Sequence, residues 1–259
     1  MVEHYSTALN FKKKLVFFIT LGVPRAFLYS QACKYQMSSF CTRNISDYIL
    51  RLEPTPKVGA CCMTPLREVD DLSNPFKAEW YNKRLHDHTS AQKNTDCNAC
   101  WNLEQQGEQS PRLLEGHLPR TRQIELQLGN TCNLSCIYCG PQFSSRWAEI
   151  TKDSDWTKIT QNNIIEANQQ RKEKVITWLL NSLSIKNPRR ISTICITGGE
   201  PTIIEDFYKI CEKLLEPGLT IRINTNLMCP PQKLDRLITL FQDLKNHGQT
   251  IILRCSIDG

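Results

Sequence analysis

Four short stretches in the second half of the chain are rich in apolar and β-branched residues, and longer mixed stretches separate them. The first of the four alternates apolar and polar positions. The other three are short runs rich in β-branched residues, which suit buried parallel strands. We therefore predict strands at Arg122–Leu128, Ile191–Thr197, Thr220–Asn224 and Thr250–Ile257.

The stretches between these strands carry apolar residues with the spacing i, i+3, i+4, i+7, which predicts amphipathic helices. We interpret three such stripes as faces that pack on the core: Ile176, Leu179, Leu180 and Leu183; Phe207, Ile210, Cys211 and Leu214; Leu234, Leu237, Ile238 and Phe241. Alternating strands and helices predict an α/β fold with a parallel sheet and right-handed crossovers. Functional loops are expected at the carboxyl ends of the strands.

Composition is consistent with a folded protein of one large or two small domains. The chain has 259 residues, of which 40% are hydrophobic, enough to build a core. The formal net charge of +6 is a mild excess, and the basic residues are dispersed apart from Lys12–Lys14. We therefore find no strong signal for nucleic-acid binding.

The chain contains thirteen cysteines, many of them at C-x-x-x-C-x-x-C and C-x-x-C spacings. Disulfide-rich secreted proteins are typically much shorter, so we expect metal or cluster ligation in a reducing cytoplasm. Cys195, Cys211 and Cys255 lie within apolar patterns and are expected to be small buried core residues.

Residues 1–32 form a separate N-terminal extension. Lys12–Lys14 followed by Leu15–Val23 resembles the charged and apolar parts of a signal peptide, but nine apolar residues are too few to span a bilayer. No cleavage site with small residues is evident, so we expect neither export nor membrane insertion. An added or wrongly translated start, a weak helix and a targeting segment remain open as interpretations.

Cys132, Cys136 and Cys139 follow the first predicted strand as C-N-L-S-C-I-Y-C. Three thiolates can hold three irons of a four-iron cluster and leave the fourth iron open, whereas a closed structural site has four protein ligands. A zinc site or unrelated free thiols are the alternatives. Later, Ile194–Thr197 leads into Gly198, Gly199, Glu200 and Pro201, where glycines allow close backbone approach and a carboxylate can accept hydrogen bonds from an ammonium group.

These two motifs, in this order, resemble those of the radical S-adenosylmethionine (SAM) enzymes. The resemblance implies a partial barrel of βα units, a [4Fe-4S] cluster on the three cysteines, and reductive cleavage of SAM to a 5′-deoxyadenosyl radical that abstracts hydrogen from a substrate. It also implies cofactor-binding roles for Tyr138, Gly198, Gly199, Glu200, Pro201, Asn224, Ser256 and Asp258. A residue that acts directly in catalysis is not identified.

Individual roles follow from the same resemblance. The backbone near Tyr138 would meet the adenine, the Gly-Gly-Glu-Pro segment the methionine amine, and Ser256 with Asp258 the ribose. Asn224 and Asn226 are candidates for the cofactor cleft and equally for ordinary turn residues. A bulky residue at Gly199 is expected to weaken cofactor binding while iron stays bound.

The end of the chain, Ser256 to Gly259, resembles the fourth strand of this family. A stop at that point would leave an exposed edge strand and omit the units that close the barrel. We therefore expect the sequence to be a fragment of a longer protein.

Residues 33–118 carry a second set of cysteines and resemble the cysteine-rich module called a twitch domain, which in related enzymes binds an auxiliary iron–sulfur cluster. Cys97 and Cys100 form a close chelating pair, and Cys41 with Cys61 would complete four ligands; Cys33 and Cys62 are rivals. Structural zinc is the alternative. Trp101 could shield this site or simply pack, and His86, His88 and His117 could be ligands or solvated surface groups.

The first hypothesis is a radical SAM enzyme with core residues 119–259, acting on a peptide or small metabolite and reduced by a donor such as flavodoxin or ferredoxin. The second is a noncatalytic iron–sulfur or zinc protein on an incomplete radical SAM fold.

Overall fold

A computed structural model describes most of the chain beyond residue 40. The described residues are 41, 43–52, 56–69, 71, 73–74, 79–90, 92–115, 122–151, 164–187 and 190–256. The N-terminal extension, Cys33, His117 and Asp258 lie outside them.

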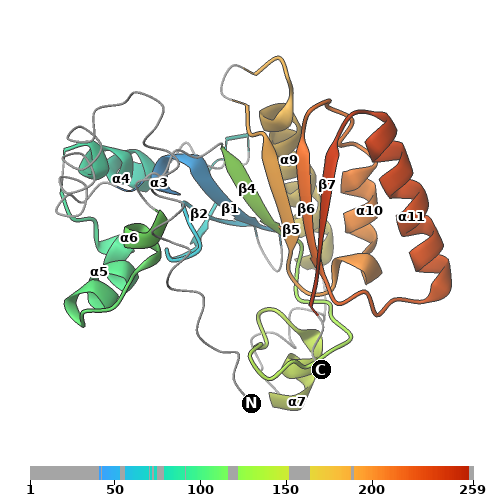
Figure 1. The fold of residues 1–259 in the computed structure, drawn as a ribbon, viewed down its shortest axis with the longest axis horizontal. Helices are drawn as coiled ribbons and strands as arrows, with labels where there is room; N and C mark the ends of the chain where they lie inside the picture. The colour runs from blue at the N-terminus through green and yellow to red at the C-terminus, as the bar shows by residue number, and fades with distance from the viewer. Residues whose placement is uncertain are drawn as a thin grey trace, which may run out of the picture.

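The central element is a seven-stranded sheet with the order β3-β2-β1-β4-β5-β6-β7 (Figure 1). Its strands are β1 (Asp47–Arg51), β2 (Lys57–Gly59), β3 (Arg67–Glu68), β4 (Gln123–Gln127), β5 (Thr193–Thr197), β6 (Thr220–Thr225) and β7 (Thr250–Cys255). Strand β1 and the four strands from β4 to β7 are parallel, while β1, β2 and β3 pair antiparallel. The four strands predicted from the sequence are β4 to β7, so the largely parallel α/β fold is confirmed.

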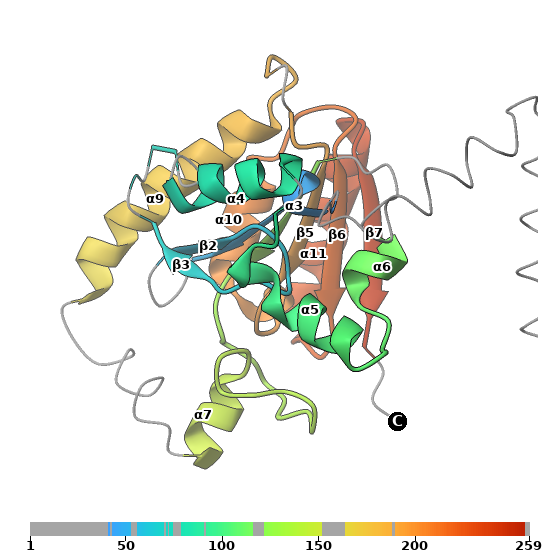
Figure 2. The same ribbon diagram turned by 90° about the vertical axis from the view of Figure 1, so that its left-hand side faces the viewer.

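Helices lie on both sides of this sheet (Figures 1 and 2). They are α3 (Arg43–Ser46), α4 (Glu79–Thr89), α5 (Asn98–Gln105), α6 (Pro111–Glu115), α7 (Ser145–Thr151), α9 (Ile164–Leu183), α10 (Glu205–Cys211) and α11 (Pro231–Asn246), with 3-10 turns η2 (Thr95–Cys97) and η4 (Pro201–Ile203). Helices α9, α10 and α11 cover one face, while α4, α5 and α6 lie beyond β1 and β2.

The sheet divides its residues by period-2 alternation. Ile194 and Ile196 of β5 and Ile221 and Ile223 of β6 are fully buried in the main core. The alternate positions of the same strands are mostly polar, and all of them except the buried Thr193 are half-buried. One face of the sheet is therefore apolar and packs against helices, and the other face is polar.

Two of the three cysteines expected in the core are not there. Cys211 is fully buried, as predicted. Cys195 is half-buried on the polar face, because alternation places it opposite Ile194 and Ile196. Cys255 is exposed on the edge strand β7.

The predicted core stripe of α10 is correct throughout, since Phe207, Ile210, Cys211 and Leu214 are all at most 2% exposed. For α11 the prediction was partly wrong. Leu237 is buried, but Leu234 and Ile238 are 41% and 48% exposed, and the core face instead uses Leu240 and Leu244. Helix α11 lies at the edge of the sheet, so part of its broad apolar arc extends beyond the last strand.

The cysteine-rich segment before residue 119 is built into the same sheet as the segment that carries the three-cysteine motif. Strand β1 pairs in parallel with β4 over five residue pairs, from Asp47 with Gln123 to Arg51 with Gln127. Leu50 and Val58 belong to the same core cluster as Leu126. The expected division at residue 118 is therefore not a break in the sheet. In the described part of the chain, no helix has the length and apolar character needed to cross a membrane.

Candidate active site

The three-cysteine loop follows β4, at the carboxyl end of the strand where functional loops were expected. Cys132, Cys136 and Cys139 are each half-buried, and the backbone N–H of Cys139 donates to the carbonyl of Cys136 at 2.9 Å. Next to them, Ile137 and Tyr138 are 92% and 72% exposed. This short loop thus carries three thiols and, between the last two of them, the exposed side chains of Ile137 and Tyr138.

Three residues that the sequence reasoning missed hold this loop in place. Ser144 is fully buried and donates to the carbonyl of Leu134 at 2.6 Å, while its oxygen accepts the N–H of Trp147 and caps α7. The Trp147 indole N–H donates to the carbonyl of Cys136 at 2.8 Å. Ser145 contacts both backbone groups of Cys132 at 3.2 Å. A serine three residues before Trp147 was a possible capping signal, but the sequence analysis did not predict the helix that it begins.

The Gly-Gly turn after β5 packs directly on the cysteine loop. Gly198 and Gly199 have φ values of +86° and +59°. A Cβ atom on Gly199 would lie 2.1 Å from the carbonyl oxygen of Thr131, and the Glu200 N–H donates to that oxygen at 2.8 Å. The close approach that these glycines permit is therefore made by the backbone just before Cys132, and not only by a ligand as the sequence suggested.

Glu200 is 1% exposed, and protein donors surround its carboxylate. One oxygen accepts from the Thr202 N–H at 3.1 Å, the Thr202 hydroxyl at 2.6 Å and the Thr225 hydroxyl at 2.5 Å; the other accepts from the Asn226 N–H at 2.6 Å. A carboxylate has about four acceptor positions. In this structure the carboxylate of Glu200 joins the loops after β5 and β6. A ligand amine would therefore contact the neighbouring backbone and not this carboxylate.

The loop after β6 joins the same assembly. The Asn226 side chain donates to the Asn133 side chain at 3.0 Å, and Asn133 donates to the Met228 carbonyl at 2.5 Å. Leu227 between them has a φ of +56°, an uncommon conformation for leucine. Three loops from three adjacent parallel strands are therefore joined at one rim.

Pro201, Asn224 and Ser256, three further predicted cofactor residues in the described part of the chain, lie close to this rim. Pro201 is buried in η4, and Ser256 is exposed beside the end of β6, where its N–H donates to the Thr225 carbonyl at 2.9 Å. Asn224 is half-buried on the polar face, and its side-chain oxygen is buried without a hydrogen-bond donor. An orphaned buried acceptor at this place is suited to a ligand with hydroxyl or amine donors.

The protein groups around Cys132 favour its neutral thiol over the charged thiolate. Burial raises the pKa of this thiol, and the charges of Glu200 and Cys139 raise it further, while the Leu134 N–H opposes them. A bound cation would reverse this preference, because metal ligation requires the thiolate. Three thiols on one loop fit iron–sulfur ligation. Among the described residues, however, no group of three or more His, Cys, Asp or Glu is arranged so that it could hold a metal ion.

The second set of cysteines also comes together. Cys41, Cys61, Cys97 and Cys100 are at most 6% exposed and line one narrow cavity of about 10 Å³. Cys62 is exposed and lines a different cavity on the polar face of the sheet. The structure thus favours Cys61 over Cys62 as a partner of the close pair.

Basic and hydrogen-bonding groups adjoin this second site. The fully buried Arg84 donates to the Cys97 sulfur at 3.9 Å. Burial raises the pKa of Cys97 to about 12, and the positive charge of Arg84 opposes this effect. Burial also raises the pKa of Cys100, against the stabilising N–H of Arg112 and hydroxyl of Ser110. These donors would stabilise the thiolates of a bound cluster or metal.

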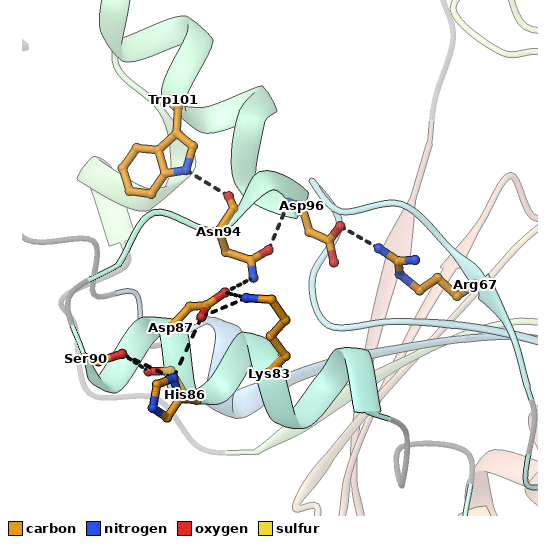
Figure 3. A network of polar contacts seen from close by, with 8 residues as sticks. All are labelled: Arg67, Lys83, His86, Asp87, Ser90, Asn94, Asp96 and Trp101. Carbon is orange, nitrogen blue, oxygen red and sulfur yellow. Dashed lines mark hydrogen bonds and ion pairs between the residues drawn. The ribbon is translucent and has the colours of Figure 1, made fainter.

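Figure 3 shows how the segment that carries Cys97 is fixed. Asp87 accepts from the Asn94 amide at 2.6 Å, and Asn94 in turn accepts the Asp96 N–H and caps η2 (Figure 3). The Trp101 indole donates to the Asn94 carbonyl at 3.1 Å. His86 lies on the outer side of this network, where it contacts Asp87 and Ser90. Trp101 is therefore part of the framework of the site, and His86 is a surface group.

The comparisons with known proteins agree with the class that these two motifs indicate. Residues 126–251 match the family model described as the radical SAM superfamily, a segment that contains both the three-cysteine loop and the Gly-Gly turn. The resemblance to radical SAM enzymes is thereby confirmed for this part of the chain.

A curated relative gives a more particular likeness. Over 103 residues the chain is 32% identical to 7-carboxy-7-deazaguanine synthase of Rickettsia prowazekii (strain Madrid E). The match includes 40% of this chain and spans 35% of the relative's length. No solved structure matches the chain.

Proposed function

We propose that this protein is a radical SAM enzyme that holds a [4Fe-4S] cluster through Cys132, Cys136 and Cys139. The observation that carries the proposal is the joining of the loops after β4, β5 and β6 at one rim through Thr131, Glu200 and Asn226. When bound, the reduced cluster would supply the electron that cleaves SAM to a 5′-deoxyadenosyl radical. The protein's own groups position the ligands and limit the access of water.

We assign these groups as follows. The buried Glu200 carboxylate fixes Thr225 and the Asn226 backbone, so it shapes the cofactor cleft from behind. The backbone of Gly198 and Gly199 would face the methionine amine, and the orphaned Asn224 oxygen would accept a hydrogen bond from the cofactor. The exposed Tyr138 segment would meet the adenine, and Ser256 and Asp258 the ribose.

Anaerobic reconstitution tests this proposal. The wild-type protein should show a four-iron absorption band and form 5′-deoxyadenosine from SAM with dithionite. Cys132→Ala should lose the product and the irons of this cluster, whereas Cys211→Ala, which removes a fully buried thiol of the helix layer, should keep both. A cluster without the product would favour the noncatalytic iron–sulfur protein instead.

We also propose an auxiliary cluster at Cys41, Cys61, Cys97 and Cys100, supported by their common cavity and by Arg84 beside Cys97. The wild-type protein would then bind about eight irons, and Cys97→Ala about four. Zinc in place of the second set of irons would assign the site to structural zinc.

A cytoplasmic location and reduction by flavodoxin or ferredoxin complete the proposal. The described cysteines are all free thiols, as a reducing compartment requires. Turnover with reduced flavodoxin or ferredoxin in place of dithionite would test the electron donor.

A further inference from the structure

The polar face of the sheet contains a cavity of about 290 Å³ that the proposed cofactor site does not use. It lies between α3 and the loop after β2 on one side and the strands β1 and β4 to β7 on the other. Its charged and thiol-bearing lining residues are Arg43, Asp47, Cys62, Glu125, Cys195, Arg222 and Arg254. This size is near the lower end for small-molecule pockets and is too small for a folded peptide segment.

Strand register explains why these side chains meet. Glu125 on β4 is in register with Cys195 on β5, and Cys195 is in register with Arg222 on β6. Arg254 on β7 is in register with Asn224, two residues further along β6 than Arg222. Residues in register on neighbouring strands form a row across the sheet. The row that contains Arg222 is about 7 Å from the row that contains Asn224, because each residue of a strand advances about 3.3 Å.

The two carboxylates of the cavity are already engaged. Asp47 pairs with Arg43 at 3.2 Å. Glu125 accepts from the Gln127 amide at 2.9 Å and from the Thr197 hydroxyl at 3.2 Å. The positive charge of Arg43 is thus balanced by Asp47. Glu125 accepts both of its hydrogen bonds on Oε1 from neutral donors, so its negative charge stays in the cavity, where three arginines against two carboxylates leave a net charge of +1.

The two remaining guanidinium groups lack such partners. Arg222 makes a 3.4 Å contact with the Gln123 amide oxygen, and its Nε is buried without an acceptor. In the described part of the chain, neither Arg222 nor Arg254 has a carboxylate within ion-pair distance. A buried donor without an acceptor is costly, and this applies to the half-buried Arg222, whereas Arg254 is exposed. Both guanidinium groups can bind a carboxylate or a phosphate through two parallel hydrogen bonds.

We propose that this cavity binds the anionic group, a carboxylate or a phosphate, of a small-metabolite substrate through Arg222 and Arg254. The inference rests on the proposed function, because it assigns a substrate class to the same enzyme. The anionic end lies in the Arg222 row, and the rest of the substrate extends toward the Asn224 row and the rim.

Cys195 provides a direct test, because its thiol shares the cavity with both arginines. The protein is alkylated anaerobically with anionic iodoacetate or neutral iodoacetamide, and each cysteine is quantified by peptide mass spectrometry. The ratio of the two rates cancels the thiolate fraction of each cysteine. We expect this ratio to be about tenfold higher at Cys195 than at Cys229, a half-buried thiol outside the cavity, owing to the attraction between opposite charges.

Variants assign the effect to the arginines. Arg222→Gln and Arg254→Gln should each lower the ratio at Cys195 severalfold, whereas Lys213→Gln, which removes a positive charge from the exposed turn after α10, should not. Melting temperatures verify that all variants are folded. Equal ratios at Cys195 and Cys229, or a Cys195 ratio that neither arginine variant changes, would overturn the proposal.

Competition identifies the anion. Phosphate or malonate at millimolar concentration should slow the iodoacetamide labelling of Cys195 at least threefold, about 0.6 kcal/mol by RT ln 3. Neutral malonamide is the control. Protection by phosphate alone indicates a phosphorylated substrate, protection by malonate alone indicates a carboxylate, and protection by neither contradicts the proposal. Labelling requires no SAM, so absence of 5′-deoxyadenosine would defeat the proposed function while leaving this site intact.

Discussion

At the residue scale, Gly199 shows how the structure changes the meaning of a motif. The sequence suggested that these glycines admit a ligand, so a bulky residue would spare the iron. In the structure, however, Gly199 lies against the carbonyl of Thr131, which directly precedes the first cysteine of the three-cysteine loop. A side chain at this position would therefore displace the cysteine loop itself.

We predict that Gly199→Ala lowers both the iron content after reconstitution and the melting temperature. Its Cβ would meet Thr131 at 2.1 Å in addition to the cost of a positive φ. Gly218→Ala is the matched control, because Gly218 has a φ of +69° and nothing within 4 Å of the added carbon. Iron equal to wild type in Gly199→Ala, with a similar melting temperature, would contradict this role.

Glu200 gives a second prediction at this scale. Glu200→Ala leaves the Thr202, Thr225 and Asn226 donors without their shared acceptor, so it should destabilise the protein by about 3 kcal/mol. Urea unfolding of the apoprotein measures the change. Glu212→Ala, at an exposed position of the same region, should cost no more than about 0.5 kcal/mol. If the two variants unfold alike, Glu200 is not the centre of the network.

At the element scale, the short helix α7 acts as the support of the cysteine loop. Ser144 caps its first turn and also holds Leu134, while Trp147 from the next residues of the helix holds Cys136. The helix is only seven residues long, and such a helix depends on its cap and its tertiary contacts.

We predict that Ser144→Ala costs about 1 kcal/mol, the typical value of a helix cap, and speeds iron loss to a chelator. The chelation rate is the decisive readout, because it reports the loop and not only global stability. Ser182→Ala, which removes a hydroxyl bonded to the Trp178 carbonyl within α9, serves as the control and should release iron at the wild-type rate. Equal rates of iron loss from both variants would show that α7 does not support the three-cysteine loop.

At the scale of the whole molecule, the cysteine-rich segment completes the sheet. Strand β1 covers the edge of β4 through five parallel pairs, and Leu50 and Leu52 are fully buried in the shared core. This arrangement also places Arg43 between the two cavities, where it lines both the second cysteine site and the polar-face cavity.

We accordingly predict that a chain begun at residue 119 fails to fold stably. It would expose the β4 edge and lose the apolar surface contributed by β1 and β2, which favours aggregation. Size-exclusion chromatography and thermal unfolding, compared with a chain begun at residue 41, measure the difference. A monomeric, cooperatively unfolding 119–259 piece would show instead that the two segments are independent.

The sequence by itself determined the strands β4 to β7, the helices α9 to α11 between and beside them, and the two short motifs that follow β4 and β5. Strand and helix patterns depend on local periodicity, so β4 to β7 and the buried stripe of α10 could be predicted. The three-cysteine loop and the Gly-Gly turn could be predicted as well, because their spacing is contained in short segments. Ser144 was within reach of the same local reasoning.

Only the tertiary structure decided which groups meet and which faces are covered. It placed Cys195 in a polar cavity and surrounded the Glu200 carboxylate with hydrogen-bond donors of the protein. It also left Leu234 and Ile238 of α11 exposed. It also aligned Arg222 with Cys195 across neighbouring strands. The physical reason is that strand register, edge position and hydrogen-bond partners depend on residues far apart in the chain, which local periodicity does not specify.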